Sequence, residues 1–152
     1  MSISGKSNSI SVVVPNYNGG RFLAQAIQSV LNQSLLPDEI IVIDDGSTDD
    51  SLQILSEFGA SIRVIHIPNS GAAVARNLGI LESSGDLIAL LDSDDYWHED
   101  KLLIQLKLIN SNPFDLVYCS SQEFIMGSGL GIVHQAHFSG DCYQYFINFF
   151  VF

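Results

Sequence analysis

The chain is poor in basic residues. Six lysines and arginines stand against 17 aspartates and glutamates in 152 residues, and the formal net charge is -11. A surface with this charge repels nucleic-acid backbones and anionic membranes, so nucleic acid is not an expected partner. A small anionic substrate would need a cation to bridge it to the protein.

The chain also has little cysteine and no long apolar run. Its two cysteines, Cys119 and Cys142, lie far apart in apolar surroundings, which favours buried free thiols over a disulfide. No stretch approaches the length of a transmembrane helix, and the N-terminal MSISGKSNSI lacks the pattern of a signal peptide. We therefore expect a cytoplasmic location, which leaves open a peripheral contact with the membrane in a full-length protein.

The sequence does contain a regular alternation of apolar strands and amphipathic helices. Expected strands cover residues 10–14, 39–44, 62–67, 86–91 and 114–120, and expected helices cover 23–31, 46–58, 72–83 and 102–109. This pattern predicts an α/β fold in which a mainly parallel sheet carries helices on both faces. The apolar runs Val12–Val14 and Leu87–Leu91 predict strands that are buried on both faces.

Polar motifs follow three of these strands: PNYNGG the first, DDGSTDD the second and DSDD the fourth. Ligands of parallel sheets bind just beyond the carboxyl ends of the strands, so we expect the site at this edge. Asp92 and Asp94 share a face if the chain is extended there, and Mg²⁺ and Mn²⁺ prefer such oxygen ligands. The Asp-x-Asp spacing is also common in turns and caps, so alone it leaves a local role open.

Four motifs in order resemble the nucleotide-binding half of family 2 glycosyltransferases. They are ISVVVPNYNGGRFLAQAIQSVLNQS, EIIVIDDGSTDDS, NSGAAVARNLGI and GDLIALLDSDDYWHEDKL, and the resemblance covers residues 9–125. It implies the Rossmann-like GT-A fold of nucleotide-diphospho-sugar transferases. It also implies transfer of a sugar from a nucleotide-diphosphate donor to an acceptor hydroxyl, with inversion at the anomeric carbon.

The resemblance implies a role for each matching residue at the nucleoside end. Pro15 and Tyr17 match positions that line the base and the ribose, and Asp45 matches the acid that accepts a hydrogen bond from the base. A carboxylate only accepts hydrogen bonds, which suits an N–H of uracil or guanine. Asp44 is grouped with these substrate-binding residues and is expected mainly to support their loop.

At the diphosphate end, Arg76 matches an arginine close to the nucleotide and the diphosphate. Asp94 is expected to bind the metal, and Asp92 to share it while lying nearer the ribose or donor sugar. The implied cofactor is Mg²⁺ or Mn²⁺, which stabilises charge on the departing diphosphate as a Lewis acid. The expected function is metal-assisted glycosyl transfer in polysaccharide biosynthesis, from a nucleotide sugar (UDP-sugar favoured) to a carbohydrate or lipid-linked acceptor.

Ordinary structural roles compete with these assignments. Tyr17 could pack in the core, Asp44 could cap a turn, and Arg76 could pair with Glu82 or another surface acid. The four ordered motifs favour the ligand roles for Tyr17, Asp45, Arg76, Asp92 and Asp94.

Other polar residues are expected outside the site. Asp49 and Asp50 are typical helix-start acids. His134 and His137 could form a metal pair, but the surrounding GSGLGIVHQAHFSG favours a hairpin or loop. Trp97 is expected to pack near the site.

The C-terminal residues 126–152 are expected to begin the acceptor side of a single domain, 1–152, shortened at its C-terminus. Inversion needs a base for the acceptor proton, and the resemblance places that carboxylate downstream, so no catalytic residue is assigned within the chain. Asp141 lies at an expected helix cap. Tyr145, Phe146 and Phe149 share a helical face and predict self-association through this segment.

Two other functions compete with glycosyl transfer. Without the acceptor-side base, the chain could be a non-catalytic nucleotide- or metal-binding domain, or an interaction domain. A phosphotransfer domain of the receiver or haloacid-dehalogenase kind would carry its key acids after the first strand, where PNYNGG has none.

Overall fold

A computed structural model describes residues 8–111, 117, 121–122 and 133–134. The chain divides into two compact units, Met1–Leu103 and Ile104–Phe152. The described strands are β1 (Ile10–Asn16), β2 (Glu39–Asp44), β3 (Arg63–His66), β4 (Leu87–Leu90), β5 (Ser121–Gln122) and β6 (Val133–His134). The described helices are α1 (Gly20–Leu31), α2 (Ser51–Glu57), α3 (Ala72–Glu82) and α4 (Lys101–Ser111), with a 3₁₀ turn at Gly59–Ser61.

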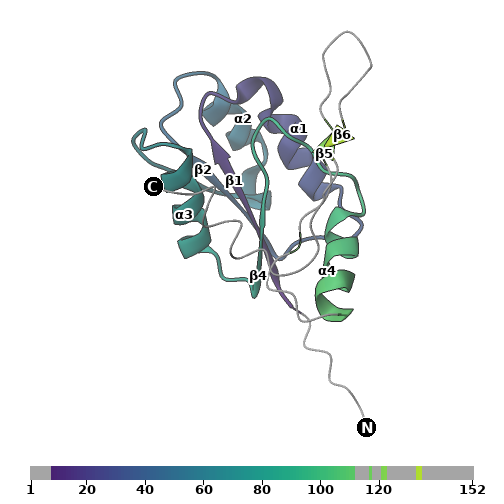
Figure 1. Cartoon of the computed structure of the whole chain (residues 1–152). Coiled ribbons are helices and arrows are strands. Elements are labelled where there is room, and N and C mark those ends of the chain that lie inside the picture. Colours follow the sequence, from purple (N-terminus) through teal and green to yellow (C-terminus); the bar gives the residue numbers. More distant parts are fainter. Residues whose placement is uncertain (1–7, 112–116, 118–120, 123–132, 135–152) are drawn as a thin grey trace. The chain divides into compact units, whose positions relative to one another are not determined.

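The first unit is built on a four-stranded parallel sheet in the order β3-β2-β1-β4. Val13 pairs with Ile41 of β2 and Leu90 of β4. Because all four strands run the same way, their carboxyl ends meet at one edge (Figure 1). The predicted α/β architecture is confirmed, and each of its first four strands and helices lies within a few residues of the expected bounds.

Helices cover both faces of this sheet, α3 on one and α1 with α2 on the other (Figure 1). On the α3 face, Ile41 and Ile43 pack with Ala75 and are fully buried. A Cβ on Gly79 would lie 2.2 Å from a methyl group of Val13, so only glycine allows this close approach of helix and strand. Strand residues alternate between faces, so the buried Val12 and Val14 point to the α1 side.

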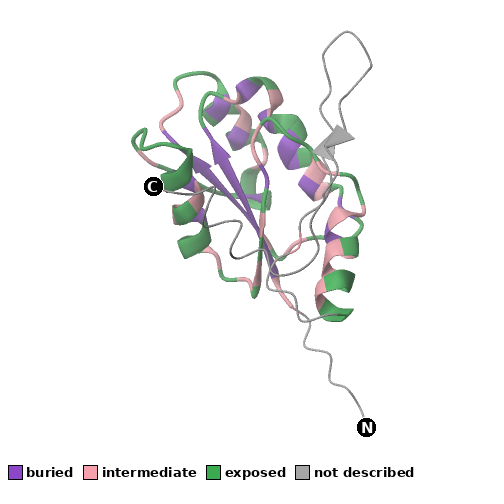
Figure 2. Ribbon diagram, viewed as in Figure 1, coloured by how far each residue is buried: buried purple, intermediate pink, exposed green. Residues whose placement is uncertain are grey.

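The central and outer strands differ in burial (Figure 2). Val12–Val14 are fully buried, as predicted. The same prediction for Leu87–Leu91 was wrong: Leu91 is buried, but Ile88 and Leu90 are 41% and 46% exposed. Within the described residues β4 pairs only with β1, and an edge strand has fewer neighbours to cover its side chains.

In the second unit, β5 and β6 form an antiparallel pair in which Ser121 faces His134. Of residues 127–140, for which a hairpin or loop was expected, the structure describes Val133 and His134 alone. The expected strand 114–120 lies outside the described residues except for Val117, which is in no strand. Cys119, His137, Cys142 and the aromatic segment also lie outside them. No described helix has the length and apolar character needed to cross a membrane.

Candidate functional site

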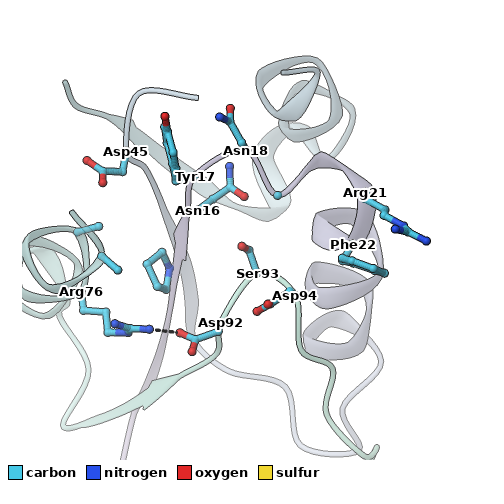
Figure 3. Close-up of a pocket in the computed structure, with 14 residues that line it drawn as sticks. Asn16, Tyr17, Asn18, Arg21, Phe22, Asp45, Arg76, Asp92, Ser93 and Asp94 are labelled. Atoms are coloured by element: carbon cyan, nitrogen blue, oxygen red, sulfur yellow. Dashed lines mark hydrogen bonds and ion pairs between the residues drawn. The ribbon is translucent and has the colours of Figure 1, made fainter. Parts of the chain in front are cut away.

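A cavity of about 560 Å³ opens at the carboxyl edge of the sheet in the first unit (Figure 3). Its walls are the loops that follow β1, β2 and β4, together with the first turns of α1 and α3. The lining residues are Pro15, Asn16, Tyr17, Asn18, Gly19, Arg21, Phe22, Asp45, Ala72, Ala75, Arg76, Asp92, Ser93 and Asp94. The structure therefore brings together every predicted site residue except Asp44.

The loop after β1 forms one wall of the cavity. Pro15 is buried, whereas Tyr17 is 52% exposed and so does not pack in the core. Asn16 is 2% exposed, and its Nδ2 donates to Asp44 Oδ1 at 3.0 Å and to Ser47 Oγ at 3.1 Å. Asn16 Oδ1 is buried and has no hydrogen-bond partner among the described residues.

Asp44 lies beneath the cavity and holds the loops around it. Its carboxylate is fully buried and accepts hydrogen bonds from Asn16 Nδ2 and from the Ser47 backbone at 3.2 Å. His66 Nδ1 lies 2.7 Å from Asp44 Oδ2. Burial alone would raise the pKa of Asp44, but the hydrogen bonds from Ser47, Asn16 and His66 together outweigh it and lower the pKa. The contacts are those of a loop support.

Asp45 lines the cavity and is 2% exposed. Its Oδ1 accepts from Ser70 N at 2.6 Å and its Oδ2 from Gly71 N at 2.8 Å. Gly71 has a φ of +95°, a conformation that favours glycine. Asp45 thus ties the start of α3 to β2. Each carboxylate oxygen has a second lone pair, which leaves capacity for a donor from a ligand.

The two acids expected at the start of a helix do lie there. Asp50 precedes α2, and Asp49 Oδ1 accepts from Ser51 N at 3.0 Å. Asp49 Oδ2 accepts from Gly20 N at 2.9 Å, at the first residue of α1. Burial slightly opposes ionisation of Asp49, but the hydrogen bonds from Ser51 and Gly20 prevail and lower its pKa.

An ion pair crosses the cavity between α3 and the loop that follows β4. Arg76 Nη2 donates to Asp92 Oδ1 at 2.6 Å (Figure 3). The Arg76 side chain is 35% exposed and that of Asp92 46% exposed. Of the two alternatives for Arg76, pairing with Glu82 does not occur, because Glu82 pairs with Arg63, whereas pairing with another partly exposed acid does occur, at Asp92.

The Asp-x-Asp loop (residues 91–96) carries a concentration of negative charge. Asp94 is exposed and lines the cavity, and it accepts no side-chain or backbone hydrogen bond recorded within the described residues. Partial desolvation, followed by the charges of Asp94 and Asp92, raises the pKa of the exposed Asp95. The described residues contain no group of three or more metal-binding side chains. Two carboxylates nevertheless fit a Mg²⁺ or Mn²⁺ ion whose other ligands are water and substrate phosphates.

Several lining residues were not anticipated from the sequence: Asn16, Asn18, Arg21 and Ser93. Asn18 has a φ of 51°, and its Oδ1 accepts from Thr48 N at 2.7 Å, so it joins two loops of the site. The signal was present, because asparagine tolerates the left-handed conformation and stands directly after a strand.

The chain matches the family model described as glycosyl transferase family 2 over residues 11–151. An uncharacterized glycosyltransferase of Rickettsia felis is 42% identical over 141 residues, which are 91% of this chain and 23% of that protein. The putative teichuronic acid biosynthesis glycosyltransferase TuaG of Bacillus subtilis is 41% identical over 104 residues, 66% of this chain and 41% of TuaG.

A solved structure, S. aureus TarS 1-349 in complex with UDP-GlcNAc, aligns with a TM-score of 0.63 and 25% identity. The alignment covers 80% of this chain and 36% of that one. The chain therefore spans about a quarter to two fifths of the length of these relatives. The family match over nearly the whole chain, on the sheet described above, shows that this protein belongs to glycosyl transferase family 2 and has the GT-A fold.

Proposed function

We propose that the cavity binds the nucleoside diphosphate part of a sugar donor, with UDP favoured. The sugar of that donor is then transferred, with inversion, to a hydroxyl of a carbohydrate or lipid-linked acceptor. The observation that carries the proposal is the meeting of three polar loops around one cavity, with Arg76 and the carboxylates of Asp92 and Asp94 at the same end. Family membership and the likeness to TarS in complex with UDP-GlcNAc support it.

The nucleoside end is suited to recognition by shape and by accepted hydrogen bonds. Tyr17 offers an exposed ring for contact with a base, and Asp45 has free lone pairs for an N–H donor. The sides of the cavity next to α3 are closed by Ala72 and Ala75, whose small side chains leave room for the ligand.

The diphosphate end is suited to charge neutralisation. Asp94, with Asp92, would hold a divalent cation, and that cation supplies charge stabilisation to the leaving diphosphate when bound. Arg76 contributes a guanidinium that donates hydrogen bonds to phosphate oxygens once it turns from Asp92. A net negative protein has few other ways to hold a dianionic ligand.

Calorimetric titration of the chain with UDP, in Mn²⁺, in Mg²⁺ and in EDTA, tests this proposal. GDP, CDP and ADP serve as matched ligands that differ only in the base. We expect UDP to bind more tightly with a divalent cation than in EDTA, and more tightly than the other nucleotides. The proposal would be overturned if no nucleotide bound at millimolar concentration, or if the affinity for UDP were the same in EDTA as in Mn²⁺ or Mg²⁺.

A further inference from the structure

The Asp-x-Asp loop is attached at both of its ends. At its start, Leu91 N donates to Val13 O at 3.0 Å, which continues the pairing of β4 with β1. After its end, Trp97 N donates to Ser29 Oγ at 3.1 Å, on α1. Within the loop, Asp95 N donates to Asp92 O at 3.0 Å. The positions of the two carboxylates therefore depend on where these two attachments lie.

The second attachment centres on Gln33, which follows α1 and is 4% exposed. Its Nε2 donates to Ser29 O at 3.1 Å and to His98 O at 2.8 Å. Its Oε1 accepts from Leu102 N at 3.0 Å. Both N–H groups and the carbonyl of one buried amide are therefore used, and two of the three bonds hold residues 98–102.

Further bonds join the same two segments. Ser34 N donates to Glu99 O at 2.8 Å, and Ser34 Oγ donates to Asp100 Oδ1 at 2.6 Å. These groups are exposed, so water competes for them. Gln33 is the buried member of the set, and its loss leaves Leu102 N without its partner in a buried place.

We propose that Gln33 is a positioning residue for the metal-binding carboxylates: its amide fixes the far end of the Asp-x-Asp loop on α1. This inference rests on the proposed function. Groups that hydrogen-bond directly to metal ligands typically change metal affinity by about 10–100-fold, which sets an upper limit for Gln33, since its bonds go to Ser29, His98 and Leu102. Three residues separate Asp94 from His98, to which Gln33 bonds, so the effect of Gln33 is on the geometry of Asp92 and Asp94 and not on the nucleoside contacts.

The test compares the wild-type chain with Gln33→Met, which has a similar length and no amide. Gln28→Met is the matched control, because Gln28 is an exposed glutamine on α1, the helix that Gln33 follows, and its amide donates to Asn32 within its own segment. UDP is titrated into each protein in EDTA and in Mn²⁺. Trp97, the only tryptophan in the chain, reports on the attachment through its fluorescence.

We expect Gln33→Met to lose several-fold, and at most about 100-fold, of the Mn²⁺ enhancement of UDP affinity, with affinity in EDTA changed less than about twofold. Its Trp97 emission should shift, and Gln28→Met should match wild type in every measurement. Full retention of the Mn²⁺ enhancement, or an equal loss in EDTA and in Mn²⁺, would overturn the inference. A wild-type chain with no metal-enhanced UDP binding would instead overturn the proposed function itself.

If Gln33→Met does not fold, Ser34→Ala carries the same test from the exposed side of the attachment. It removes the hydroxyl bond to Asp100 and leaves every buried bond in place. We expect a selective loss of the Mn²⁺ enhancement of at most about tenfold, the value of one hydrogen bond. An unchanged enhancement in Ser34→Ala would then count against the role of this attachment.

Discussion

Two acidic loops at the same edge of the sheet differ in how many hydrogen bonds their carboxylates accept. In the β2 loop (residues 44–50), Asp44, Asp45 and Asp49 all accept hydrogen bonds from neighbouring backbone or side-chain donors. In the Asp-x-Asp loop, Asp92 has one arginine, and the structure records no donor to Asp94 within the described residues. The first loop uses its carboxylates to hold neighbouring loops and helix starts, whereas the second leaves the carboxylate of Asp94 without a donor among the described residues.

The pKa shifts of Asp44 and Asp49 in the first loop and of Asp95 in the second have opposite directions. Hydrogen bonds prevail over burial in the β2 loop and lower the pKa of Asp44 and Asp49. In the Asp-x-Asp loop, desolvation and like charges act together and raise the pKa of Asp95. The surroundings therefore favour the charged forms of Asp44 and Asp49 and disfavour the charged form of Asp95. Substitutions of individual charged residues test this difference between the two loops.

The largest effect is expected from Asp94→Asn. Loss of a directly bound carboxylate should reduce the Mn²⁺ enhancement of UDP affinity by more than about 100-fold, which exceeds the effect of outer-shell changes. Thermal stability should hold or rise, since Asp94 is exposed and repels its neighbours. Asp95→Asn is the control: it removes an adjacent charge of the same sign and should change the enhancement far less. Equal losses in both variants would mean that only diffuse charge attracts the metal.

Asp44→Ala should mainly affect stability, in contrast to Asp94→Asn. It removes a fully buried carboxylate and strands the donors of Asn16, Ser47 and His66, so we expect the free energy of unfolding to fall by about 2–3 kcal/mol. Urea unfolding measures this change. Asp50→Ala is the control in the same loop, because Asp50 is exposed and its side chain makes no capping bond. It should stay within about 0.5 kcal/mol of wild type, and a comparable loss there would contradict the proposed division.

The acid dependence of stability follows from the lowered pKa of Asp44. A group whose pKa is lower in the folded chain contributes stability that is present above its unfolded pKa and is lost as pH falls through the folded value. The ordinary pKa of Asp44 is 3.8, so this contribution should be complete near pH 5 and should decline as pH falls below about 4. Urea unfolding at several pH values should show a shallower decline for Asp44→Ala than for wild type. Parallel curves would show that Asp44 is not a source of the acid dependence.

The sequence predicted the sheet well because the relevant signals are local. The apolar run Val12–Val14 and the polar motifs after it follow from alternation and from the geometry of parallel strands. The burial of Leu87–Leu91 was mispredicted because the neighbours of a strand depend on its position in the sheet, which an apolar run does not encode. The strand order β3-β2-β1-β4 likewise depends on how the whole unit folds, and no single strand sequence encodes it.

The site residues divide along similar lines. Arg76, Asp92 and Asp94 stand in recognisable motifs, and they line one cavity as those motifs suggested. The buried bonds of Gln33 could not be foreseen, because a glutamine two residues beyond a helix has the same local pattern whether or not its partners lie 65 residues away. Polar contacts between residues far apart in the sequence can be identified only once the fold is known.

A small change in stability, and the sharpest test of the Asp-x-Asp loop, are expected from Arg76→Met. The ion pair with Asp92 is partly exposed on both sides, so its loss should alter the free energy of unfolding by less than about 1 kcal/mol. Without the guanidinium, Asp92 Oδ1 is released for a cation, so Mn²⁺ alone should bind more tightly. UDP in the presence of Mn²⁺ should bind less tightly, because the diphosphate loses a hydrogen-bond donor.

Arg63→Met is the matched control, since the pair of Arg63 with Glu82 lies outside the residues that line the cavity. It should leave both affinities unchanged. Calorimetry with Mn²⁺ alone and with UDP plus Mn²⁺ separates the two effects by sign. If both affinities fall in Arg76→Met, the arginine supports the loop and does not compete with the metal for Asp92.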